Sequence, residues 1–93
     1  MKYSSYQMGT IVEITESSNE KFKYITIAKN PEDVYTHVKL VYSEQTLILN
    51  CEYGQIPLEK LKVGDIVMAF HSNAMTLSIP PQTTVYILEL KSC

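Results

Sequence analysis

The sequence predicts an all-β protein, a small OB-like β-barrel of five to six mostly antiparallel strands with one short helical turn. Apolar residues recur mostly with the two-residue period of strands that have one buried face. Turn-forming residues interrupt the chain about every ten residues, as in small barrels and sandwiches. Only 19% of the residues are charged, and closing the sheet removes the open strand edges that such a chain protects poorly. A small β-sandwich is the alternative fold.

The expected strands follow one another along the whole chain. They are residues 10–15, 22–28, 35–41, 46–51, 66–71 and 83–90, with a further short extended piece at 75–79. Polar residues 16–20 predict a hairpin between the first two strands. Residues 46–51 are apolar on both faces, which predicts a central or covered strand. In the last strand, the alternation places Tyr86, Leu88 and Leu90 on one face and Val85 and Ile87 on the other.

A short helical segment is expected within residues 56–65. Leu58 and Leu61 are three residues apart, as on one face of a helical turn, and Pro57 stands at a helix-starting position. Gly64 is expected to close this turn as a left-handed cap.

The chain is short enough to form one domain. It has 93 residues and a mass of 10.6 kDa, so residues 1–93 are expected to fold as a single β-barrel domain with residues 1–6 as a loose tail. The first eight residues lack the apolar core of a signal peptide, and no apolar run reaches membrane-spanning length. The chain as given is therefore expected to be cytoplasmic, or extracytoplasmic if a leader has been removed. Cys51 and Cys93 are expected as thiols, with a disulfide as the alternative.

Charge and catalytic patterns argue against several functions. The net charge is −2 and every basic side chain is lysine, which disfavours duplex nucleic acid and bidentate phosphate recognition. His71 and Ser72 are adjacent in a strand and point to opposite faces, so they do not form a nucleophile–base pair. His37 and His71 are 34 positions apart without a ligand pattern around them. We therefore expect neither catalysis, metal nor cofactor.

Three segments carry a resemblance to a known group of domains. They are residues 61–67 (LKVGDIV), residues 78–82 (SIPPQ) and residues 9–14 of the opening hairpin. With them, the chain resembles small uncharacterised OB-like β-barrel domains of Firmicutes, which are often parts of lipoproteins or secreted proteins. The resemblance implies the barrel fold over most of the chain and assigns no activity to any residue.

The loop from residue 71 to residue 82 is the candidate binding site. Loops on a rigid scaffold commonly carry binding function, and two prolines lower the entropy cost of ordering this one. We expect a non-catalytic module that contacts a protein partner or a small ligand here. The candidate binding residues are His71, Ser72, Asn73, Met75, Thr76, Ser78 and Gln82. In the alternative interpretation these polar groups satisfy backbone groups at a barrel corner, while Met75 and Ile79 plug the barrel end.

Two other binding functions remain open. A single-stranded nucleic acid would stack on aromatic rings over a positive face. The residues that could form such a face are Lys21, Lys23, Tyr24, Tyr35 and Lys39. A small peptidase inhibitor is the other alternative, in which the stiff segment 78–81 would enter a cleft of the enzyme.

Overall fold

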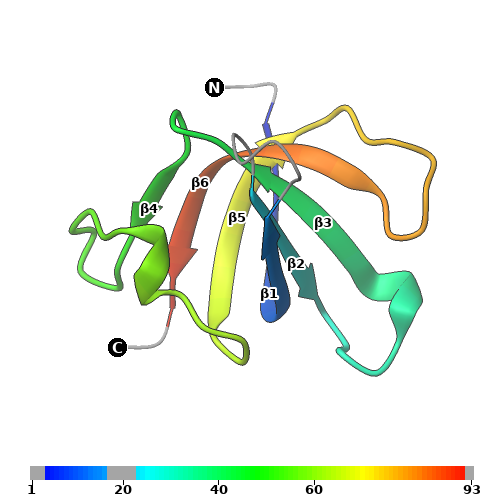
Figure 1. The fold of residues 1–93 in the computed structure, drawn as a ribbon, viewed down its shortest axis with the longest axis horizontal. Coiled ribbons are helices and arrows are strands. Elements are labelled where there is room, and N and C mark those ends of the chain that lie inside the picture. Colours follow the sequence, from blue (N-terminus) through cyan, green and yellow to red (C-terminus); the bar gives the residue numbers. More distant parts are fainter. Residues whose placement is uncertain (1–3, 17–22, 92–93) are drawn as a thin grey trace.

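The computed structural model describes residues 4–16 and 23–91 and confirms a small all-β barrel. Its elements are β1 (Ser4–Glu16), β2 (Lys23–Ala28), the 3-10 turn η1 (Val34–Thr36), β3 (His37–Tyr42), β4 (Leu47–Leu49), the 3-10 turn η2 (Leu58–Lys60), β5 (Ile66–Ser72) and β6 (Gln82–Leu90) (Figure 1). All strand pairings are antiparallel except those of β3 with β6 and β4 with β6.

Five strands close on themselves to form the barrel. The strand order is β3-β2-β1-β5-β6, and the parallel pairing of β3 with β6, in which Leu40 faces Thr83, completes the ring. β4 lies outside this ring, on the second half of β6, where Ile48 pairs with Leu88 (Figure 1). The expected strand at 46–51 is therefore three residues long and is not central, although Ile48 is buried.

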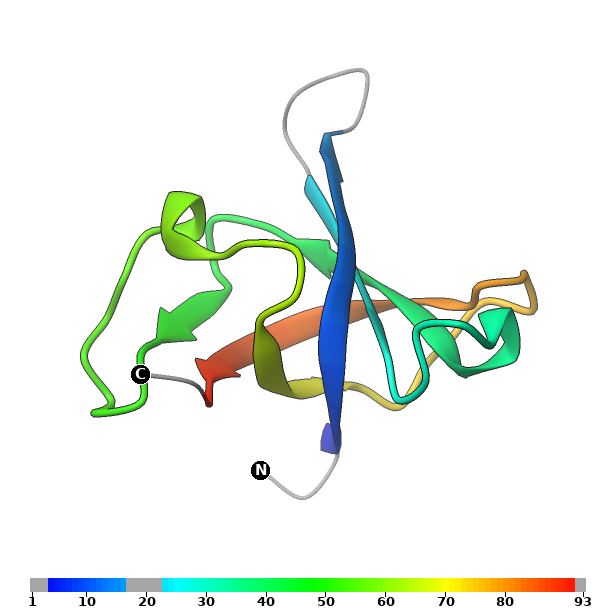
Figure 2. The ribbon, with the colours of Figure 1, turned by 90° about the horizontal axis from the view of Figure 1, so that it is seen from below.

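β1 is long because it pairs with two different strands along its length. Its first half pairs with β5 and its second half with β2, and Thr10 lies opposite both Ile66 and Ala28. Figure 2 shows this strand crossing the whole molecule. Residues 4–6, expected in a loose tail, are paired with β5 instead. Gly9 lies where β1 and β2 meet, because a Cβ there would stand 3.1 Å from the backbone nitrogen and oxygen of Ala28.

Alternate strand residues point inward and form one core together with Leu58 of η2 and Leu61, which follows η2. Its members are Ile11, Ile25, Ile27, Val38, Leu40, Ile48, Leu58, Leu61, Val67, Ala69, Val85 and Leu88. The expected alternation is interrupted in β6, where Phe70 pairs with Ile87 but His71 pairs with Val85. Tyr86 is the extra residue of this bulge, so Val85 and Leu88 both point inward. The predicted separation of these two side chains onto opposite faces is wrong.

The irregular segments differ from the expectations in three places. Residues 35 and 36 belong to η1, which Asp33 caps by accepting a hydrogen bond from the Tyr35 N–H, and the strand begins at His37. The helical segment within 56–65 is the single turn η2, which starts after Pro57 as predicted. Gly64 has a φ of 101° but lies in a separate turn, and Leu61 caps η2. Residues 75–79 form no strand.

The cysteine expectation also needs a correction. Cys51, expected as a thiol, is disulfide-bonded. Cys93 lies outside the described residues. The favoured interpretation of two thiols is therefore wrong, and the alternative of a disulfide holds for Cys51.

Candidate functional site

His71 occupies the inside of the barrel at the start of the predicted loop. Its side chain is 2% exposed. Ring nitrogen Nδ1 lies 2.9 Å from the Ser72 carbonyl oxygen, which only accepts, so Nδ1 carries the proton. Nε2 lies 3.2 Å from Nε2 of Gln7 in β1 and accepts its hydrogen bond. His71 was predicted to contact a ligand. Because both of its ring nitrogens form hydrogen bonds inside the barrel, it instead stabilises the start of the loop.

The far part of the loop is closed by its own side chains. The Thr76 N–H donates to the Gln82 carbonyl at 3.0 Å, and the Gln82 N–H donates back to the Thr76 hydroxyl at 2.9 Å. The Ser78 hydroxyl lies 2.6 Å from that of Thr76 and donates to the Pro80 carbonyl at 2.9 Å. These contacts fix residues 76–82 as one compact loop, since the two hydroxyls replace backbone partners that a free loop would seek in water. Thr76 and Ser78 therefore stabilise the loop.

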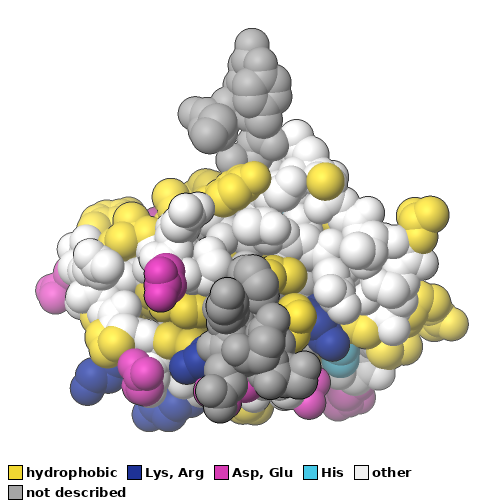
Figure 3. All heavy atoms as spheres, turned by 45° about the horizontal axis from the view of Figure 1, so that its top comes forward, with side chains coloured by type: hydrophobic (Ala, Val, Ile, Leu, Met, Phe, Trp, Pro, Cys, Tyr) yellow, Lys and Arg dark blue, Asp and Glu magenta, His cyan; other side chains and the backbone are white. Residues whose placement is uncertain are grey.

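Closing the loop in this way leaves its apolar side chains in the solvent. Leu77 is fully exposed, and Ile79 and Met75 are 66% and 40% exposed. In Figure 3 hydrophobic side chains project at the right-hand end of the molecule, where Figure 1 places this loop and η1. The alternative in which Met75 and Ile79 plug the barrel is thus wrong. Leu77 was not among the predicted binding residues, because sequence alone does not tell which side of an irregular loop faces outward.

A shallow pocket of about 350 Å³ lies at the base of the loop. Its lining comprises Val41, Ser72, Ala74, Met75, Thr76, Gln82, Thr83 and Thr84. Four of the seven predicted binding residues, Ser72, Met75, Thr76 and Gln82, therefore share one pocket. Val41 and Thr84 were missed, because only the parallel pairing of β3 with β6 places them face to face. Its described lining residues carry no charged side chain and combine hydroxyl, carboxamide and apolar groups.

The remaining predicted loop residue, Asn73, has a structural contact. Its Oδ1 accepts a hydrogen bond from the Ser5 hydroxyl, which ties the start of the loop to β1. The Ala74 N–H donates to the Ser72 hydroxyl at 3.0 Å, and the Thr83 hydroxyl donates to the Ser72 carbonyl at 2.9 Å. The first residues of the loop are therefore held on both sides.

The alternative nucleic-acid face is only partly assembled. The Lys39 ammonium lies 5.4 Å from the centre of the Tyr24 ring, and Lys39 pairs with Gln82 across β3 and β6, so this pair adjoins the loop pocket. Lys23 lies 3.5 Å from the Glu16 carboxylate, which offsets its charge, and Lys21 lies outside the described residues. Tyr35, 80% exposed, lies on η1 and not on the strand face.

The other close ion pair of the described segments lies at the end of β6 opposite the loop. Lys91 Nζ lies 2.8 Å from a carboxylate oxygen of Glu89. The hydrogen bond that the Lys91 ammonium donates to this carboxylate, and then the carboxylate's charge, raise the pKa of Lys91. Residues 4–16 and 23–91 bring together no group of three histidine, cysteine, aspartate or glutamate side chains able to hold a metal ion. Within the same residues, no helix is long and apolar enough to cross a membrane.

Comparison with known proteins does not assign the site. No model of a known protein family matches the chain, and no curated protein matches it either.

Proposed function

We propose that the chain is a non-catalytic binding module that contacts a protein partner through the 71–82 loop. The observation that carries this proposal is the closed loop that holds Leu77 and Ile79 in the solvent. A fully exposed leucine on an ordered segment is a natural anchor, because burying such a side chain is worth about 1.5–3 kcal/mol. Since the loop is already ordered, little of that gain is lost to ordering on binding.

The pocket at the base of the loop supports the same proposal. A partner that covers Leu77 also meets the hydroxyl and carboxamide groups around Thr84 and Gln82, which can orient it without any charge. The Gln82 carboxamide has no hydrogen-bond partner among the described residues. It is therefore available to a ligand without the loss of an existing bond.

The strand order favours an OB-like assignment of the barrel. Its five strands in chain order are β1, β2, β3, β5 and β6, and the candidate loop joins the last two. In OB-folds, ligands bind on the face of strands two and three and on the loop between strands four and five. The Lys39–Tyr24 pair and the loop pocket occupy these two places. The analogy with OB-folds therefore supports the location of the proposed site.

Selection of peptide ligands tests the proposal. Peptides are selected from a random display library against the wild-type protein, and their affinities are then measured for a Leu77→Ser/Ile79→Ser variant. We expect at least about a tenfold loss, because two apolar anchors are removed. Val63→Ser is the matched control, since Val63 is 64% exposed and lies in the loop at the other end of β5. Equal affinity of the selected peptides for the wild type and the double variant contradicts the proposal.

A small peptidase inhibitor is a second candidate, favoured by the same closed loop. The Ser78 bond to the Pro80 carbonyl keeps the segment 78–81 in one shape, and a stiff exposed segment enters an enzyme cleft at low entropy cost. Titration against peptidases that accept large apolar side chains distinguishes the candidates. Inhibition that Leu77→Ser or Ile79→Ser abolishes favours an inhibitor, whereas cleavage of the loop or no effect removes this candidate.

Single-stranded nucleic acid is the remaining candidate from the sequence. In the alternative nucleic-acid face, the described residues offer one cation without an ion-pair partner. This cation is Lys39, which lies over the Tyr24 ring. Fluorescence anisotropy with a labelled oligonucleotide at two salt concentrations tests it. Binding that weakens steeply with salt would support this function, and absent or salt-independent binding excludes it.

A further inference from the structure

The first half of β1 has an open edge. The Ile11 N–H donates to the Asp65 carbonyl and the Ile11 carbonyl accepts from the Gly64 N–H, both at 2.8 Å. The main-chain groups of Ile11 therefore point toward the β5 side. Because these groups alternate along a strand, those of Tyr6 and Met8 point the opposite way. The register from Ser4 to Thr10 is regular, so the alternation holds over this stretch.

Nothing in the described chain pairs with this edge. β2 is the neighbour on that side, but its last residue, Ala28, lies opposite Thr10. Towards the N-terminus from Thr10, β1 pairs with β5 alone. The N–H and C=O groups of Tyr6 and Met8 thus have no strand partner within the described chain. These four main-chain groups are spaced as in a sheet, so an added strand could form hydrogen bonds with them.

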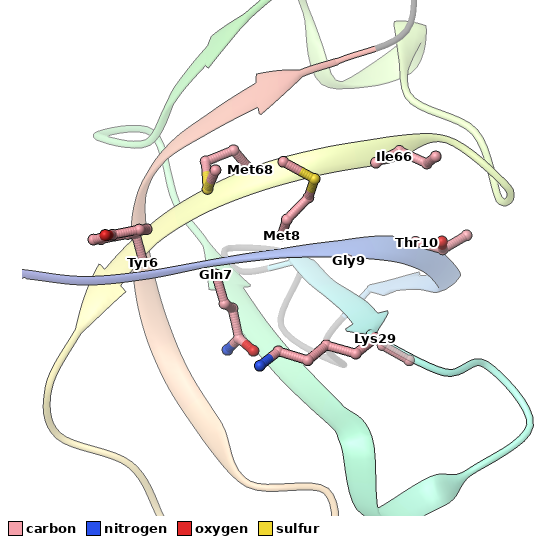
Figure 4. Close-up of a pocket in the computed structure, with 9 residues that line it drawn as sticks. Tyr6, Gln7, Met8, Gly9, Thr10, Lys29, Ile66 and Met68 are labelled. Atoms are coloured by element: carbon pink, nitrogen blue, oxygen red, sulfur yellow. The ribbon is translucent and has the colours of Figure 1, made fainter.

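A groove of about 530 Å³ runs along this edge (Figure 4). One wall is apolar, since Met8 faces Met68 across the strands and the Tyr6 ring lies 6.0 Å from that of Phe70. Met8 and Ile66 are 44% and 43% exposed, so this wall is open to solvent. An alternating strand laid along the edge would place every second side chain against it.

Lys29 lies beside the groove. Among the described residues that line the groove, Lys29 is the only charged one, and Figure 4 shows its side chain extending along the edge of β1 towards the Gln7 carboxamide. Lys29 forms no ion pair within residues 4–16 and 23–91. An unpaired lysine beside an open edge and an apolar wall selects for an occupant that carries a carboxylate.

We propose that this groove binds an extended, acidic segment of another protein by strand addition to β1. The segment pairs its main chain with Tyr6 and Met8, lays apolar side chains on the Met8–Met68 wall and places an aspartate or glutamate beside Lys29. Main-chain pairing supplies affinity and the side chains supply selectivity, as in other strand-addition sites. The inference is independent of the 71–82 loop, because it uses a different edge of the barrel.

The direct test uses an acetylated and amidated hexapeptide of alternating valine and threonine in which one threonine is replaced by glutamate. Titration followed by amide NMR is expected to shift the signals of Tyr6, Met8 and Lys29 first. N-methylating the peptide on the edge that faces β1 should weaken binding about tenfold or more, since it removes main-chain donors. N-methylation on its other edge is the matched control and should leave the affinity unchanged. Equal weakening by both peptides, or no binding at all, overturns strand addition.

Variants of the protein test the two recognition elements separately. Met8→Pro removes the N–H that faces the groove and leaves the bonds of its odd-numbered neighbours to β5, so we expect about threefold to tenfold weaker binding than for Met8→Ala. Lys29→Ala should weaken binding of the glutamate-containing peptide by a similar factor. It should leave unchanged the affinity for the same alternating valine–threonine peptide without the glutamate. Tighter binding by Lys29→Ala would mean that this lysine guards the edge, which contradicts its role as the counter-charge. Sedimentation of the protein alone as a dimer that Met8→Pro dissociates would assign the edge to a second copy and overturn the proposal.

Discussion

His71 connects the barrel to the candidate loop. We expect its replacement by alanine to destabilise the protein by an amount that follows from its contacts. His71→Ala loses the bond to Gln7 at 3.2 Å and the bond to the Ser72 carbonyl at 2.9 Å. At about 1 kcal/mol for each hydrogen bond and about 1 kcal/mol for the lost packing, the free energy of unfolding falls by about 3 kcal/mol. For a domain of this size that corresponds to a Tm lower by about 12–24 °C.

Thermal unfolding followed by circular dichroism measures this loss of stability. A matched variant separates the contributions of the two hydrogen bonds. The carboxamide nitrogen in His71→Asn can take the place of Nδ1 and keep the bond to the Ser72 carbonyl, while Gln7 loses its acceptor. We therefore expect His71→Asn to unfold at a temperature between those of His71→Ala and the wild type. A Tm of His71→Ala within about 3 °C of the wild type would refute the assignment of His71 as a support of the loop.

Three further predictions concern the fold and the loop. Gly9→Ala places a Cβ 3.1 Å from the main chain of Ala28 and should cost about 1–3 kcal/mol in urea unfolding, whereas an unchanged midpoint would contradict the close crossing of β1 and β2. Leu88→Ala, at a fully buried position, should cost about 2–5 kcal/mol in the same assay, and a loss below 1 kcal/mol would contradict its place in the core. Thr76→Val removes the acceptor of the Gln82 N–H and should speed exchange of that amide at least about tenfold, with Tm nearly unchanged; unaltered exchange would show that the hydroxyl does not close the loop.

The barrel was predictable because the alternation of apolar residues along its strands indicates which side chains are buried. The two-residue period of Ile25 and Ile27, and of Val38 and Leu40, identifies their inward faces without knowledge of any neighbour. The length of β1 was not predictable, since its first half pairs with β5, more than fifty positions away in the sequence. Non-local pairing of this kind leaves no local pattern.

The position of the candidate loop was predictable from the sequence, but the structural roles of its residues were not. The concentration of polar residues between two apolar strands located the loop, and Ser72, Met75, Thr76 and Gln82 do share a pocket. The sequence did not reveal that the hydroxyl of Thr76 turns inward to close the loop, because an irregular segment has no period from which the direction of a side chain can be read. The same reason hid the exposure of its apolar residues.

Amide NMR of the labelled protein with a peptide selected against it is the most direct test of the proposal that the 71–82 loop is the binding surface. We expect the largest shifts on the signals of Leu77, Ile79, Gln82 and Thr84, and none of these shifts for the Leu77→Ser/Ile79→Ser variant at the same peptide concentration. Shifts confined to other parts of the barrel, with these four signals unmoved, would show that the peptide binds elsewhere and would overturn the proposal.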